Sequence, residues 1–278
     1  MAYTPPDRVF GVDFSGAKDA GKKVWVAEID ATETPRLVGC APATERFDVE
    51  ADRVSTHRAL TQYVGSLAGD AAVGFDFPFA LPETVVSAEN WVRFLREFPG
   101  QFASPAELQR RCQSRAELAD GDRVQHVRAT EESVGALSPY NHRLKKQTFY
   151  GIRDVLRPLV LTDAVRVVPM QSLSPDRPTV LETYPAAALD SLDGETHRHG
   201  YKEANEDGRE RRAANLDALE AEAALTLSED VREALLDDTD ADGLDAVLAA
   251  FATWRNTADP TNLDIDDAQY DAEGYIYV

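Results

Sequence analysis

The sequence predicts an α/β fold in which helices cover a sheet. Short apolar runs bounded by turn residues occur at 8–14 and 71–77, which is typical of buried strands. Longer segments, such as 144–161 and 243–255, place apolar residues at helical spacing. A chain that alternates between these two patterns is expected to pack its helices against a sheet.

The first half of the chain predicts four strands and one helix. Strands are expected at 8–14, 23–29 and 36–40, where short connections favour an antiparallel meander. A helix at 53–67 then leads to a fourth strand at 71–77. This order predicts that the fourth strand joins the sheet after the chain has crossed one of its faces.

A largely helical insertion is expected at 83–145 within a single domain that spans 1–278. Apolar residues of 91–98 follow the i, i+3, i+4, i+7 stripe of a helix, whereas 119–137 is polar and is expected to form a loop. The remaining elements are expected as a helix at 144–161, strands at 165–170 and 179–184, helices at 208–225, 229–236 and 243–255, and a terminal strand or tail at 275–278.

The composition indicates a soluble cytoplasmic protein. Hydrophobic residues make up 43% of the chain, but no apolar run reaches the ~18 residues that a membrane span requires. The N-terminus lacks the pattern of a secretory signal. Cys40 and Cys112 are too few for a disulfide framework and lack metal-site spacing, so both are expected to be thiols in a reducing compartment.

The charge balance is strongly acidic. Asp and Glu number 49 against 29 Lys and Arg, which gives a net charge of −20. Such a surface repels itself unless salt screens it, so a halophilic host is expected, with an ordinary acidic cytosolic protein as the alternative. The same charge opposes broad binding to nucleic acid but permits a small site organised by a divalent cation.

Carboxylates recur near the carboxyl ends of three apolar strands. Asp13, Asp76 and Glu182 each lie in an apolar run that ends in a turn-forming residue. A buried carboxylate is costly unless it is paired or bound to a metal. Because ligands collect at the carboxyl ends of strands in open α/β sheets, these three side chains are expected to converge.

A fourth acidic cluster opens the helix at 243–255. Asp242 and Asp245 are three residues apart and share one helix face. Oxygen-only ligands suit Mg²⁺ or Mn²⁺, and two such ions about 4 Å apart can drive phosphodiester hydrolysis. The expected metal ligands are Asp13, Asp76, Glu182, Asp242 and Asp245, and all of these except Asp242 are also expected to be catalytic.

Each of these carboxylates also has a structural interpretation. Asp242 is suited to cap its helix, and Asp245 is favourably placed in the first turn. Glu182 is suited to pair with a buried arginine. Asp13 is suited to form a turn, and Asp76 to accept a hydrogen bond at the end of its strand.

Basic residues near the helix at 208–225 supply a candidate phosphate-binding group. Lys202, Arg209 and Arg212 flank the loop that enters this helix, and the two arginines are three residues apart. The alternative is a surface of ion pairs with the neighbouring acidic residues.

An ordered set of motifs resembles one known family. The chain contains, in order, GVDFSGAK (11–18), GFDFPFALP (74–82), SPYNHRLKKQTFYGIRDVLRPL (138–159), ETYPAA (182–187), GRERR (208–212), DGLDAVLAA (242–250) and EGYIYV (273–278). Together these motifs resemble domain of unknown function 429, a family described as predicted RNase H-like nucleases. The resemblance spans nearly the whole chain.

The resemblance implies an RNase H-like fold with a mixed five-stranded sheet and helices on both faces. It implies metal-site positions at Asp13, Asp76, Glu182, Asp242 and Asp245, with Lys202, Arg209 and Arg212 as the corresponding basic residues. The hypothesis is therefore a metal-dependent nuclease that hydrolyses phosphodiester bonds in a nucleic acid or nucleotide substrate by a two-metal carboxylate mechanism.

Two alternatives to the nuclease hypothesis stay open. One is a nucleotide-binding or ATP-hydrolysing protein of the actin-like ATPase group, because Asp followed by Ser-Gly also suits phosphate binding. The other is a non-catalytic binding module that one cation stabilises. The sequence leaves the oligomeric state and the chemical identity of the substrate open.

Overall fold

A mixed sheet of seven strands forms the centre of the computed structural model, which describes residues 3–86, 88–223 and 225–278. The strand order is β3-β2-β1-β4-β6-β5, and β7 also pairs with β6. The strands are β1 (Arg8–Asp13), β2 (Trp25–Asp30), β3 (Arg36–Pro42), β4 (Ala71–Asp76), β5 (Arg166–Val167), β6 (Thr179–Thr183) and β7 (Ile276–Tyr277).

The predicted meander is confirmed, because β1, β2 and β3 pair antiparallel in chain order. β4 pairs parallel to β1, and β6 pairs parallel to β4. The strands expected at 165–170 and 275–278 are present as the short strands β5 and β7 beside β6, so the five-stranded sheet that the resemblance implied is two strands too small. Each of these strands is only two residues long, shorter than the segments 165–170 and 275–278 that predicted them.

The main helices are α1 (Ala43–Phe47), α2 (Arg53–Gly65), α3 (Trp91–Gln101), α4 (Pro105–Asp120), α5 (Ala129–Val134), α6 (Lys145–Tyr150), α7 (Arg157–Leu161), α8 (Pro185–Ala188), α9 (Glu206–Ala223), α10 (Glu229–Asp237), α11 (Asp242–Thr257) and α12 (Ala268–Glu273). A π-helical segment, Gly151–Leu156, joins α6 to α7, so the helix predicted at 144–161 is continuous.

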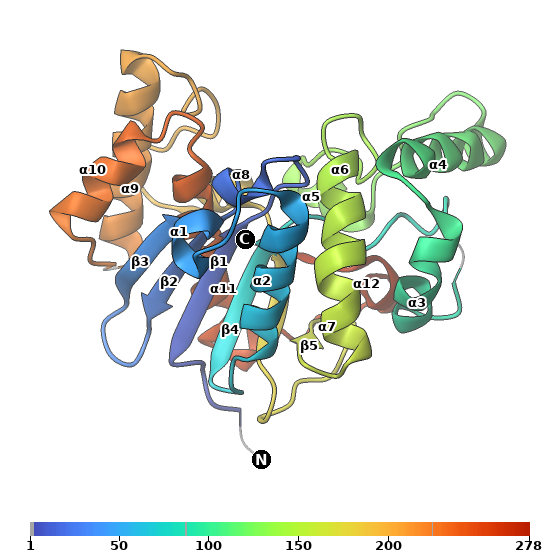
Figure 1. The fold of residues 1–278 in the computed structure, drawn as a ribbon, viewed down its shortest axis with the longest axis horizontal. Helices are drawn as coiled ribbons and strands as arrows, with labels where there is room; N and C mark the ends of the chain where they lie inside the picture. Colours follow the sequence, from blue (N-terminus) through green and yellow to red (C-terminus); the bar gives the residue numbers. More distant parts are fainter. Residues whose placement is uncertain (1–2, 87, 224) are drawn as a thin grey trace.

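Helices cover both faces of the sheet. In Figure 1, α2, α6 and α7 lie in front of the strands, whereas α11 lies behind them with α9 and α10 at one side. Val12 and Phe75 belong to the apolar core on the first face, and Val9 and Ile29 belong to the core beneath α11. Because successive strand residues point to opposite faces, Asp13 shares the face of Val9 and Gly11 and therefore points toward α11.

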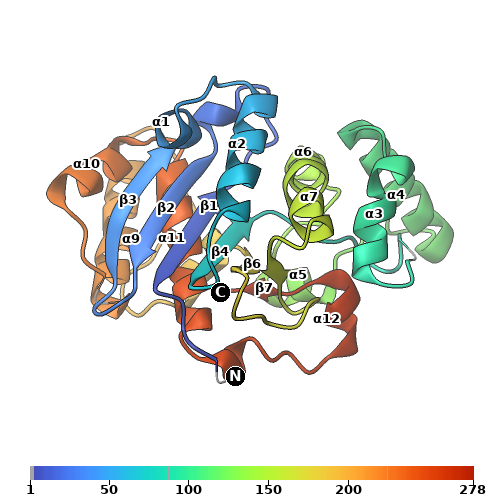
Figure 2. The ribbon, with the colours of Figure 1, turned by 60° about the horizontal axis from the view of Figure 1, so that its bottom comes forward.

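Helices α3 and α4 lie at the opposite side of the molecule from α9 and α10 (Figure 2). They belong to the stretch 83–145, and α3 buries the predicted stripe that includes Trp91 and Phe98. The loop expected at 119–137 contains the short helix α5. Among the described residues, no helix combines the length and the apolar character that crossing a membrane requires.

Candidate metal site at the carboxyl ends of the strands

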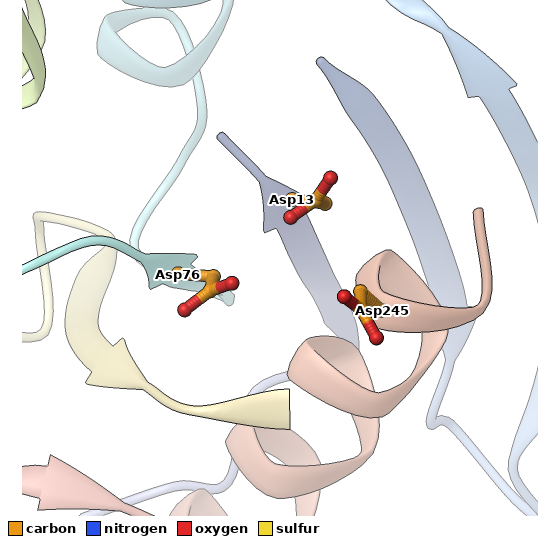
Figure 3. A group of neighbouring side chains, drawn as sticks. All are labelled: Asp13, Asp76 and Asp245. Atoms are coloured by element: carbon orange, nitrogen blue, oxygen red, sulfur yellow. The ribbon is translucent and has the colours of Figure 1, made fainter. Parts of the chain in front are cut away.

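Three aspartates from distant parts of the chain come together at one edge of the sheet. Asp13 and Asp76 are the last residues of β1 and β4 and pair in register, and Asp245 lies in the first turn of α11. One oxygen of each carboxylate lies within 4.8 Å of the other two. Figure 3 shows these side chains turned toward a common point. The structure thus brings together three of the five expected metal-site residues.

The three aspartates open into a cavity of about 590 Å³. Its lining includes residues from the strand ends, from the segment 198–202 before α9, and from Ala136 to Gln147 at the end of the insertion. A cavity of this size falls in the range that small-molecule sites in proteins occupy. The strand ends therefore face a space that accommodates a ligand.

Burial and mutual repulsion make the aspartates hard to ionise without a cation. Asp13 is only 8% exposed, and its burial, together with the nearby Asp245 carboxylate, raises its pKa well above the ordinary value. The same two causes raise the pKa of Asp76 to about 7. A divalent cation among these oxygens would favour the ionised forms.

Lys202 supplies one positive charge within this group. Its Nζ forms an ion pair with one oxygen of Asp245, and the Tyr201 hydroxyl donates a hydrogen bond of 2.8 Å to the other oxygen. Burial lowers the pKa of the Lys202 amine, but Asp245, Tyr201 and Asp13 together outweigh this effect and raise the pKa above its usual value. Lys202 thus lies in the cavity, as expected, and carries its charge beside the aspartates.

Asp242 borders the cavity but lies outside the group of three carboxylates. Its carboxylate is 3.8 Å from Lys23 Nζ, which also pairs with Asp240. Burial raises the pKa of Asp242 to about 6, although the Lys23 amine opposes this shift. Asp242 does not cap α11, since Asp238 accepts the hydrogen bond from the Gly243 amide at 2.8 Å.

Glu182 also borders the cavity but points to the other face of the sheet. It lies opposite Phe75 in the pairing of β6 with β4, so it shares the face of Phe75 and not that of Asp76. Arg128 Nη1 is 2.9 Å from one Glu182 oxygen, and Nη2 contacts the other. The amide of Phe79 donates a further hydrogen bond of 2.9 Å. The structure therefore matches the alternative interpretation, in which Glu182 pairs with a buried arginine.

Arg128 connects three parts of the chain in this network. Its side chain is fully buried, and its guanidinium also donates to Glu131 at 2.6 Å and to the carbonyl oxygen of Glu273 at 2.7 Å. Burial lowers the pKa of Arg128, but the Glu131 and Glu182 carboxylates raise it above the ordinary value. Arg128 therefore stays charged and holds the insertion against β6 and the C-terminal segment.

Thr183 is the residue of β6 that shares the face of the aspartates. It follows Glu182, so it points the opposite way, and its methyl group lies next to Gly74 on the α11 side. Thr183 is 2% exposed and lines the cavity, and its buried Oγ1 has no hydrogen-bond partner within 3–86, 88–223 and 225–278. Sequence reasoning missed Thr183, because the face of a strand residue depends on a register that the sequence does not reveal.

The expected roles of Arg209 and Arg212 require correction, because neither residue lines the cavity. Arg209 forms exposed ion pairs with Glu233 and Asp237. The Arg212 guanidinium is buried and donates to the backbone oxygens of Leu236 and Tyr201 at 2.8 and 2.7 Å. Their spacing on α9 predicted a shared face correctly, but that face packs on α10 and the segment before α9.

Besides Lys202, the basic side chains that border the cavity among the described residues are Lys23, Arg143, Arg198 and His199. Arg198 lies 5.4 Å above the Tyr184 ring and pairs with Asp190. Arg143 is exposed, and its guanidinium makes no hydrogen bond or ion pair with another described residue. Arg143 lies within the motif 138–159, which also contributes Leu144 and Gln147 to the cavity lining. This motif is the feature of the sequence from which Arg143 could have been found.

The fold and the site define an α/β protein with an acidic cavity at the carboxyl edge of its sheet. Residues 11–268 match the family model described as "Protein of unknown function (DUF429)", so the chain belongs to this family. The match covers most of the chain and confirms the resemblance that the motifs indicated. No curated protein and no solved structure matches the chain.

Proposed function

We propose that the protein is a metal-dependent phosphodiesterase with an RNase H-like core. The observation that carries this proposal is the meeting of Asp13, Asp76 and Asp245 in a cavity, with oxygens within 4.8 Å of one another. Carboxylate oxygens are the ligands that Mg²⁺ and Mn²⁺ prefer, so the donor set fits either ion. A cation at this point supplies positive charge to a reacting phosphate and to the group that attacks it.

The arrangement of the strands supports the proposed core. An antiparallel meander, β1 to β3, is extended by the parallel strands β4 and β6, with helices on both faces. The candidate ligands on β1 and β4 lie at the carboxyl ends of neighbouring parallel strands, where open α/β sheets bind their ligands. Fold alone does not determine activity, so the proposal depends on the acidic group.

Basic side chains at the cavity give the proposed reaction its phosphate contacts. Lys202 already lies beside Asp245, and half of its side chain is exposed. Arg143 has a guanidinium that no other described residue engages, and its planar donors suit a phosphate. In this proposal Lys202 stabilises charge at the reacting phosphate, and Arg143 binds a neighbouring part of the substrate.

The test is hydrolysis by purified protein in concentrated KCl with Mn²⁺. Branched, hybrid and single-stranded nucleic acids should be compared with a dinucleotide. Asp13→Asn should abolish cleavage, because it removes one ligand charge from the cation site. Asp176→Asn is the matched control, since Asp176 is exposed in the turn before β6, at the opposite end of that strand from the cavity. Cleavage that survives Asp13→Asn would contradict the proposal.

The same experiment separates the two alternative functions. Stabilisation by a nucleotide together with ATP hydrolysis would favour the actin-like ATPase group. A rise in melting temperature with Mn²⁺, without turnover of any substrate, would favour a non-catalytic module that a cation stabilises.

A further inference from the structure

Two of the five carboxylates expected to bind metal lie outside the group of three and have partners of opposite charge. Glu182 is held by the fully buried Arg128 on the far face of its strand. Asp242 lies near Lys23, outside the group of three oxygens. A second divalent cation near Glu182 would lie close to the guanidinium of Arg128 and would have to displace it. Burying that guanidinium without its partner is strongly unfavourable.

The charges that remain match one divalent cation. Asp13, Asp76 and Asp245 carry three negative charges when ionised, and Lys202 beside Asp245 carries one positive charge. The remainder of two negative charges is neutralised by a single Mg²⁺ or Mn²⁺. Counted over these four side chains, a second such ion would leave two positive charges in excess in a largely buried setting, which is costly.

An unpaired hydroxyl in the cavity gives independent evidence of a ligand. Thr183 lines the cavity on the same face as Asp76, and its buried Oγ1 has no hydrogen-bond partner among the described residues. A buried polar atom without a partner is costly and points to a missing group. A hydrated cation between Asp13, Asp76 and Asp245 would supply that partner through its water.

We propose that the cavity holds one divalent cation, bound by Asp13, Asp76 and Asp245 and supported by Thr183, while Arg128 occupies the Glu182 carboxylate and Lys202 supplies one positive charge beside Asp245. This inference rests on the proposed metal-dependent function. It replaces the two-metal mechanism that the sequence led us to expect with a mechanism that uses one cation. It assigns Glu182 to holding Arg128 and not to binding metal.

The test is the number of Mn²⁺ ions bound per chain, measured by electron paramagnetic resonance during titration in concentrated KCl, which suppresses weak surface binding. The wild-type protein should bind one ion tightly, and Asp13→Asn should remove it. Thr183→Val, which keeps the side-chain shape, should weaken binding by about 10- to 100-fold, as loss of a supporting contact does. Glu182→Gln should leave the number and affinity of bound ions unchanged.

The outcomes distinguish this inference from the proposed function. Two tightly bound Mn²⁺ ions per wild-type chain would overturn the single-cation proposal, even if the protein cleaves phosphodiesters. One bound ion without any hydrolysis would support the cation site and overturn the proposed activity. If Glu182→Gln fails to fold, the number of ions in the wild-type protein still decides between one cation and two.

Discussion

Gly11 and Gly74 lie opposite each other on β1 and β4, two residues before Asp13 and Asp76. A side chain at Gly11 would meet the backbone of Ala246 and Ala250 at 2.1 Å, and one at Gly74 would meet Thr253 Oγ1 of α11 at 2.0 Å. The two glycines let α11 lie directly on the strands. This close contact brings Asp245 to the strand ends, where it meets the two aspartates.

Substitution of Gly11 by alanine is expected to destabilise the protein by at least about 1–3 kcal/mol, because the added Cβ would overlap the backbone of α11. Urea unfolding in concentrated KCl measures the change. Gly100→Ala in α3 is the control, since nothing lies within 4 Å of its added Cβ and a gain of about 0.5–1 kcal/mol is expected. Equal stability of Gly11→Ala and the wild type would show that α11 tolerates displacement.

Removal of the buried Arg128 charge should cost about 3–5 kcal/mol, because Arg128→Met leaves Glu182 and Glu131 buried without their partner. The double variant Arg128→Met/Glu182→Gln should recover part of this loss. Arg209→Ala is the control: its ion pairs with Glu233 and Asp237 are exposed, so a change of less than about 1 kcal/mol is expected. Similar losses for the two arginines would contradict the assigned roles.

Binding of Mn²⁺ should strengthen as the pH rises. The pKa of Asp76 is raised to about 7 and that of Asp13 well above its ordinary value, chiefly by burial, so protons compete with the cation at lower pH. The apparent affinity should increase between about pH 6 and about pH 8, as Asp76 loses its proton without the help of the metal. Titration calorimetry at several pH values measures this slope. An affinity that is constant across the range would mean that Asp76 is not a ligand.

Loss of the Lys202 amine should lower the rate of hydrolysis by about 10²- to 10³-fold, as removal of a group that stabilises developing charge does in other enzymes. Lys202→Ala should still bind Mn²⁺, because Asp13, Asp76 and Asp245 remain. Arg209→Ala should hydrolyse substrate at the wild-type rate, since Arg209 does not line the cavity. Initial rates of hydrolysis at saturating Mn²⁺ measure both effects. Equal rates for Lys202→Ala and the wild type would show that Lys202 has no role in the proposed reaction.

The sequence was sufficient to predict the elements that carry the three aspartates. Asp13 and Asp76 end clear apolar strands, and Asp245 opens a helix with a strong apolar pattern. A charge at the end of a buried element is visible without knowledge of its neighbours, because its burial is costly. The convergence of these residues follows from the parallel pairing of β1 with β4, which the short meander and the following helix indicate.

The sequence alone did not predict the position of a side chain where that position depends on strand register or on a partner far along the chain. Glu182 and Thr183 are adjacent, and only the pairing of β6 with β4 determines which one faces the aspartates. Arg128 lies in a stretch whose polarity predicted a loop, and its burial depends on Glu182 and Glu273, which lie far along the chain. Arg212 shows the same effect, because its buried guanidinium binds backbone oxygens that no pattern reveals.

The most direct test of the central claim is a crystal structure of the protein soaked with Mn²⁺, in which anomalous scattering locates the metal. The account predicts one strong site with oxygens of Asp13, Asp76 and Asp245 within about 2.0–2.6 Å of the ion. It also predicts that Arg128 still pairs with Glu182 in that structure. A crystal in which these three aspartates bind no Mn²⁺, or in which Glu182 leaves Arg128 to bind a second ion, would contradict the account.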